Sequence, residues 1–130
     1  KVKEVVMKIF NGDTPIYLQL RAHIEELILE GTLAEEAQIH SQRVMASEYG
    51  LNPITVGNAL SLLVDEGVLE KKRGVGMFVA LGAREKIINA LSKDFITDSL
   101  EPVLRKARQL ELPKALITQS LNKIYGGKDE

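Results

Sequence analysis

The 130-residue sequence contains no cysteine, which excludes disulfide bonds, thiol catalysis and thiolate metal sites. It also has no apolar run near the ~20 residues that a transmembrane helix requires. Its first ten residues, KVKEVVMKIF, carry too much charge to predict a secretory signal peptide. With 45% hydrophobic and 27% charged residues, the sequence predicts a globular protein, without a membrane partner. The lack of cysteine fits the reducing cytoplasm.

Groups that would indicate an enzyme are also scarce. The histidines are His23 and His40, and neither has a carboxylate at the spacing of a known metal motif. The sequence Gly74-Val75-Gly76 precedes a predicted strand and not a helix, so it lacks the setting of a phosphate-binding loop. We therefore expect no catalytic residue, no metal and no cofactor.

A first helix is predicted to begin at Pro15, because Thr14 is a suitable N-cap and proline fits the first helical position. Gly31 is expected to end it, and TLAEEAQIH to be a connecting segment. Apolar residues recur at helical spacing and predict one buried stripe, made of Ile16, Leu20, Ile24 and Leu27.

Two more helices are predicted around a tight turn at Gly50. The shorter one, Gln42 to Tyr49, has Ser41 as its N-cap. The longer one, Pro53 to Glu66, has Asn52 as its N-cap and ends at Gly67. Its predicted buried face consists of Val56, Ala59, Leu60 and Leu63.

A β-hairpin is predicted next, since the β-prone segments VLEKK and MFVA flank the turn sequence RGVG. The N-terminal VVMKIF is a candidate edge strand. Three helices and a hairpin indicate a mainly α fold with a small β-hairpin, the winged helix-turn-helix, over residues 1–80 with an N-terminal extension at 1–13. Four dispersed aromatic residues are expected to pack in the protein: Tyr17, Tyr49, Phe78 and Phe95.

The segment 81–130 differs in composition from the rest. From Ala83 to Leu110 it has no glycine and a single proline, Pro102, which predicts helix with a break near Glu101. Pro113 is expected to start another helix. So short a helical pair cannot cover its own apolar stripes, which must pack against the winged-helix domain or against a second chain. Of these we expect the second, a dimerisation domain. The expected interface residues are Leu91, Phe95, Leu100, Val103, Leu104, Ala107, Ile117, Leu121 and Ile124.

Polar residues of the last two winged-domain helices, together with the basic hairpin turn, are candidate DNA-binding groups. Arg43 can bind a phosphate or reach a base edge, and an arginine beside glycines in the turn can enter a minor groove. Plainer interpretations stay open, since Asn52 is a sufficient N-cap and the Lys-Lys-Arg run is typical of a solvated turn. The full candidate set is Ser41, Arg43, Asn52, Thr55, Asn58, Lys72, Arg73, Gly74 and Gly76.

The segments TPIYLQLRAHIEELILEGTL and IHSQRVMASEYGLNPITVGNALSLLVDEGVLEKKRGVGMFVA resemble the DNA-binding domain of GntR-family transcription regulators. The resemblance covers Thr14 to Ala80, and the short helical tail is similar to that of the YtrA-like branch. It implies a homodimeric regulator, most simply a repressor, that binds double-stranded DNA at a palindromic operator. It further implies control of ABC-transporter genes in some members and leaves room for a small-molecule effector.

Residue by residue, the resemblance assigns DNA contacts to Arg43, to Thr55 and to Arg73 with its neighbouring glycines. The chain departs from the family where Asn52-Pro53 replaces Ser-Arg or Thr-Arg, and where Gly57 replaces an arginine of many members. Gly57 is interpreted as lying toward the exposed side, either merely tolerated or allowing the helix backbone a close approach to the groove. In both cases Gly57→Ala is expected to raise thermal stability.

The reading helix, Pro53 to Glu66, holds no lysine and no arginine. One interpretation is a DNA-binding regulator with two subunits that bind together. In each subunit, Arg43, the basic hairpin turn (the wing) and the N-terminus of the reading helix attract the phosphates. The alternative is a winged-helix module that has weak or lost DNA binding and acts through protein contacts.

Overall fold

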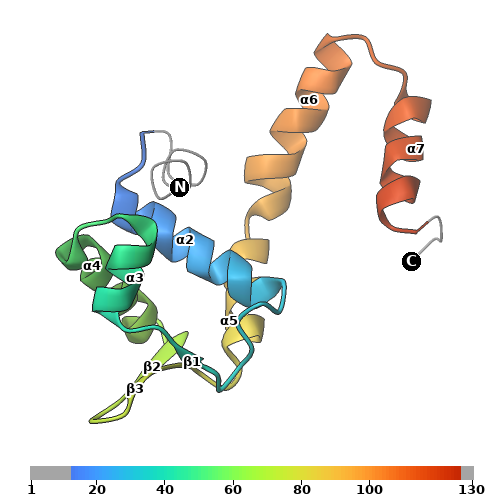
Figure 1. The fold of residues 1–130 in the computed structure, drawn as a ribbon. Helices are drawn as coiled ribbons and strands as arrows, with labels where there is room; N and C mark the ends of the chain where they lie inside the picture. The colour runs from blue at the N-terminus through green and yellow to red at the C-terminus, as the bar shows by residue number, and fades with distance from the viewer. Residues whose placement is uncertain (1–12, 127–130) are drawn as a thin grey trace. The chain divides into compact units, whose positions relative to one another are not determined.

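The computed structural model describes residues 13–126 (Figure 1). They divide into two compact units between Ala90 and Leu91. The predicted strand at VVMKIF lies outside the described residues. None of the helices in 13–126 is long and apolar enough to cross a bilayer. The first unit contains α2 (Ile16–Leu29), β1 (Gln38–Ile39), α3 (Gln42–Tyr49), α4 (Pro53–Asp65), β2 (Leu69–Lys72), β3 (Gly76–Val79) and all but the last two residues of α5 (Ala83–Ser92).

The first helix begins one residue later than predicted. Pro15 is the N-cap of α2 with an extended backbone, and no side chain caps the helix, so Thr14 does not have the capping role assigned to it. Instead the Thr14 carbonyl accepts a hydrogen bond from the Gln19 side chain. The helix ends at Leu29, and Gly31 follows with a left-handed φ of 91°.

The capping pattern of α3 and α4 agrees with the sequence prediction. The Ser41 hydroxyl accepts a hydrogen bond from the Val44 amide, and the Asn52 side chain accepts one from the Ile54 amide. Between the helices Gly50 adopts a left-handed φ of 67°, which glycine tolerates without strain. α4 ends at Asp65, one residue before the predicted end.

The core joins α2, α4 and the sheet. The predicted buried face of α4 is confirmed, with Val56, Ala59 and Leu63 completely buried and Leu60 3% exposed. In α2 the buried residues are Leu20, Ile24 and Ile28, so Ile28 takes the place expected for Leu27, which is half-buried.

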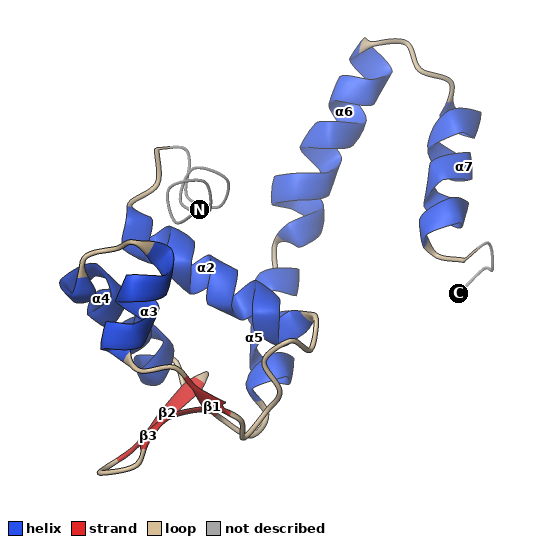
Figure 2. Cartoon of the chain, in the orientation of Figure 1, coloured by secondary structure: helices blue, strands red, loops and turns tan. Residues whose placement is uncertain are grey.

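The sheet has three antiparallel strands in the order β1–β3–β2 (Figure 2). The hairpin of β2 and β3 was predicted, whereas β1 was not. β1 lies in the segment expected to be a connection, and its Ile39 pairs with Met77 of β3. Two residues are too few to show the alternation that reveals a strand, so tertiary pairing determines this one.

The first unit extends to Ala90 and not to the predicted boundary at Ala80. The physical reason is that Ala83 and Ile87 of α5 belong to the core, exposed by 0% and 1%. The Glu35 carboxylate accepts hydrogen bonds from the Gly82 and Arg84 amides at the start of α5, and the Arg84 side chain donates to the Leu29 carbonyl at the end of α2.

The second unit contains the π-helical turn η1 (Ile96–Leu100), α6 (Glu101–Gln109) and α7 (Lys114–Ile124). The predicted irregularity near Glu101 is present as η1, where the Glu101 amide donates to the Ile96 carbonyl. Pro102 lacks an amide hydrogen and its ring displaces the carbonyl four residues earlier, which widens the preceding turn. A break at Lys93 and Asp94 was not predicted.

Candidate nucleic-acid interface

The outward surface of α4 is uncharged over its first three turns. Ile54 in the first turn is 71% exposed, and Asn58 and Ser61 are exposed further along the helix. Thr55 is half-buried at the edge of this surface. Among the candidates named from the sequence, Asn58 is therefore the most accessible on α4, and Ile54 is a residue that the sequence argument missed.

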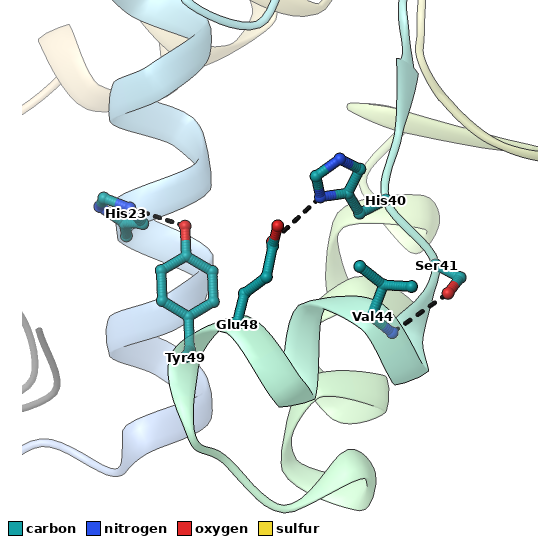
Figure 3. Close-up of polar contacts among 6 residues, drawn as sticks. All are labelled: His23, His40, Ser41, Val44, Glu48 and Tyr49. Carbon is teal, nitrogen blue, oxygen red and sulfur yellow. Dashed lines mark hydrogen bonds and ion pairs between the residues drawn. The ribbon is translucent and has the colours of Figure 1, made fainter. Parts of the chain in front are cut away.

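Ser41 and Asn52 are both occupied by capping. The Ser41 hydroxyl lies 3.2 Å from the Val44 amide, which Figure 3 shows at the start of α3. The Asn52 carboxamide oxygen lies 2.8 Å from the Ile54 amide. Each cap satisfies one free helix N–H, so both residues have a structural reason to be present whether or not they touch DNA.

Gly57 has intermediate exposure and lies beside α3. The Gln42 side chain lies across it, and a Cβ added at Gly57 would be 2.7 Å from the Gln42 amide nitrogen. That nitrogen donates a 2.8 Å hydrogen bond to the Pro53 carbonyl in the first turn of α4. The missing side chain therefore makes room for a polar bridge between the two helices, an explanation that the sequence argument did not consider.

Glycines shape the wing between β2 and β3. The Val75 amide donates to the Lys72 carbonyl at 2.9 Å, closing a turn in which Gly74 has a φ of 77°. Gly76 has a φ of 144°, and a Cβ there would collide with the Gln38 side-chain amide. That amide donates to the Val75 carbonyl at 3.0 Å, so Gly76 lets β1 hold the wing tip.

The basic residues of the wing point to different faces. Lys72 lies over the Phe78 ring, with its Nζ 4.5 Å from the ring centroid. Its neighbour Lys71 points to the other face of the strand and, with Gly57 and Ser61, lines the hollow between the sheet and α4. Arg73 is exposed in the turn. Lys71, absent from the candidate set, thus shares a side with the reading helix.

Arg43 is exposed on α3. No ion pair joins Arg43, Lys71 or Arg73 to an acidic side chain within residues 13–126. In contrast, Glu66 at the end of α4 forms a 2.7 Å ion pair with Arg21. Glu66 is therefore partly neutralised, while Asp65 at the end of α4 has no ion pair among the described residues and the three cations remain available.

Two polar pairs tie α3 to its surroundings (Figure 3). The His40 Nδ1 lies 3.0 Å from a Glu48 carboxylate oxygen at the surface. The His23 Nε2 on α2 lies 3.1 Å from the Tyr49 hydroxyl, with the two rings edge to face. Burial lowers the pKa of His23 and raises that of Tyr49, so the neutral forms are favoured at this contact.

The second unit has apolar surface but no interior. No residue among 91–126 is buried, and Ala107 and Ile117 are the most covered apolar ones, at intermediate exposure. Phe95, expected to pack, is 54% exposed. An open groove of about 370 Å³ between α6 and α7 is lined mainly by apolar side chains, among them Leu104, Leu112, Ile117 and Leu121. The other expected interface residues exposed here are Leu91, Leu100, Val103 and Ile124.

Residues 16–79 match the family described as bacterial regulatory proteins, gntR family. The solved structure of YtrA from Sulfolobus acidocaldarius, a GntR-family transcription factor, is 32% identical with a TM-score of 0.55, and the match covers 67% of this chain and 93% of that one. The chain belongs to the GntR family. The predicted winged-helix fold class is thereby confirmed.

The resemblance to the YtrA-like branch is also confirmed. The HTH-type transcriptional repressor YtrA of Bacillus subtilis is 29% identical over 121 residues, which cover 90% of this chain and 92% of that protein. The DNA-binding domain of AraR, solved in complex with operator ORX1, is 28% identical with a TM-score of 0.51, over 55% of this chain and 92% of that one. The chain spans only 32% of the length of the HTH-type transcriptional repressor NagR of Bacillus subtilis and 29% of the length of the regulator YurK from the same organism. The GntR family consists of regulators and not enzymes, as the sequence predicted for this chain.

Proposed function

We propose that this GntR-family protein is a cytoplasmic, homodimeric transcriptional repressor that binds a palindromic operator. In each subunit α4 enters the major groove of one half-site, with Arg43 and the wing residues Arg73 and Lys71 beside it. Two copies on one two-fold-symmetric site bind far more tightly than either alone, because the second contact is made at high effective concentration. Control of ABC-transporter genes and binding of a small-molecule effector stay predictions.

The observation that carries the proposal is the set of exposed cations around a helix whose first three turns are uncharged. Arg43, Lys71 and Arg73 have no acidic partner among the described residues, whereas Glu66 is paired with Arg21. An unpaired cation is free to contact a phosphate and to release counterions when it does so. The remaining candidates on α4, Thr55 and Asn58, then supply polar contacts to bases.

The dimer is supported by the second unit. Its large apolar side chains, such as Val103 and Ile124 at 63% and 78% exposure, have no cover within residues 91–126. Contiguous apolar surface of this kind marks an association site. A second copy of the same tail is the partner that every molecule has available, and it offers a self-complementary surface.

Selection of bound fragments from a random DNA pool, followed by fluorescence anisotropy on the selected site, tests DNA binding. The charge reversal Arg73→Glu should abolish binding. Lys93→Glu, a charge reversal at an exposed position outside the proposed DNA-binding surface, should leave it nearly unchanged. Selection of a symmetric site supports the proposal. No enrichment from the pool would favour the alternative of a protein-interaction module.

Light scattering on full-length protein tests the dimer. Leu121→Asp places a charge in the apolar groove and should convert the dimer into a monomer. Asn122→Asp changes an exposed polar neighbour on the same helix and should leave the dimer intact. A monomeric wild-type protein at micromolar concentration would contradict the proposed assembly.

A further inference from the structure

Ile54 is an unusual residue for the outermost position of a reading helix. It is 71% exposed in the first turn of α4, and its own amide is held by the Asn52 cap. An exposed isoleucine gains nothing in the free protein, but it gains about 0.8 kcal/mol for each methylene-sized group that a partner buries. In a major groove, the apolar group available for such a contact is the C5 methyl of thymine.

Asn58 lies four residues further along the same helix and is also exposed. Residues at this spacing share a helix face, with Cβ atoms about 5–6 Å apart. That distance is under two base-pair steps of ~3.4 Å, so both side chains can face adjacent or next-nearest base pairs. An asparagine carboxamide can make two hydrogen bonds to the N6 and N7 positions of adenine.

The lack of arginine and lysine on α4 also favours recognition of A·T base pairs. Guanine is most often read by arginine or lysine, and α4 has neither. Two residue types suited to thymine and adenine thus occupy the exposed face of a helix that lacks a guanine reader. On the basis of the proposed function, we propose that α4 reads A·T base pairs, with Ile54 against a thymine methyl group and Asn58 on an adenine edge.

The experiment uses the full-length protein and the site selected from the random pool. Each thymine of the half-site is replaced in turn by deoxyuracil, which removes only the C5 methyl group, and affinities are measured by anisotropy. At one thymine the wild-type protein should lose about fourfold in affinity, the equivalent of one buried methyl group. Ile54→Ala should bind the thymine and uracil forms of that position equally.

Leu81→Ala is the matched control, because Leu81 is 73% exposed and follows the end of β3 opposite the wing turn. This variant should keep the full uracil penalty. A parallel replacement of the adenine within two base pairs by 7-deazaadenine should weaken the wild type and leave Asn58→Ala unaffected. Since Ile54 and Asn58 are at the surface, neither alanine variant should disturb folding.

The outcomes separate the two proposals. If the wild type enriches no DNA, the proposed function and this inference are both overturned. If it binds a selected site but Ile54→Ala shows the same uracil penalties as wild type, only the A·T recognition by α4 is overturned. A selected half-site whose α4 positions are G·C pairs would overturn it as well.

Discussion

Replacing Gly57 by alanine should stabilise the protein less than helix propensity alone predicts. An alanine in a helix interior is favoured over glycine by about 1 kcal/mol. In this structure the new Cβ would lie 2.7 Å from the Gln42 amide nitrogen, so the Gln42 side chain must move away. That movement breaks its hydrogen bond to the Pro53 carbonyl, because the same nitrogen is the donor.

The gain in helix propensity and the loss of the Gln42 hydrogen bond are of similar size and opposite sign. A hydrogen bond of this kind contributes about 0.5–1.5 kcal/mol net, and this one is exposed and falls near the lower end. Gly57→Ala in the wild-type background should therefore change the free energy of unfolding by less than about 0.5 kcal/mol. In a Gln42→Ala background no bridge remains to be broken, so the same substitution should add the full amount, about 1 kcal/mol.

Urea unfolding of the wild type, both single variants and the double variant, at one protein concentration, measures this difference as a coupling energy. We expect about 0.5–1 kcal/mol between positions 42 and 57. Additive effects, with Gly57→Ala worth the same in both backgrounds, would refute the bridge. Operator affinity measured on the same proteins shows whether the bridge also sets the position of α4 for binding.

Three further predictions concern other parts of the first unit. Arg43→Ala should cost about 1–3 kcal/mol of specific binding if Arg43 reads a base. Lys71→Ala should instead weaken binding to all sequences alike and lower the salt slope by about 1 in anisotropy titrations. Equal losses on all sequences for both variants would contradict this division. Burial lowers the pKa of His23, so the unfolded chain takes up a proton first as the pH falls below the ordinary value of about 6.5. Stability against urea should decline over that range, and His23→Gln should flatten the decline; identical slopes would rule His23 out. Glu35→Gln should speed hydrogen exchange of the α5 amides. Backbone hydrogen bonds from Gly82 and Arg84 lower the pKa of Glu35, so the stabilisation by this carboxylate should be present at neutral pH and lost as acid protonates it. Unchanged exchange in the variant would mean that α5 docks without Glu35.

Local signals were sufficient for much of the first unit. Ser41, Gly50 and Asn52 mark helix ends through side-chain chemistry and backbone freedom, and the structure uses all three as predicted. Thr14 carries the same signal but does not cap, since α2 begins after the extended Pro15. Because Thr14 and Pro15 could each be the N-cap, the sequence located the start of α2 only to within one residue.

Contacts between distant segments were not predictable. β1 exists because Gln38 and Ile39 pair with β3, and α5 belongs to the first unit because Ala83 and Ile87 enter its core. In the candidate site, the Gln42 bridge over Gly57 joins residues of different helices, so no local sequence pattern indicates it. The exposure of Ile54 could have been predicted, because helical periodicity places this residue opposite the buried face of α4, which consists of Val56, Ala59, Leu60 and Leu63.

The tail without buried residues has a consequence for the amount of protein in the cell. If α6 and α7 are covered only by a second copy, much of the folding free energy becomes a function of protein concentration, and the melting temperature rises with it. A newly made or diluted protomer presents its apolar helices to proteases and chaperones until it meets a partner. Degradation would then remove single subunits faster than pairs, which sets a lower limit on expression below which the regulator does not accumulate.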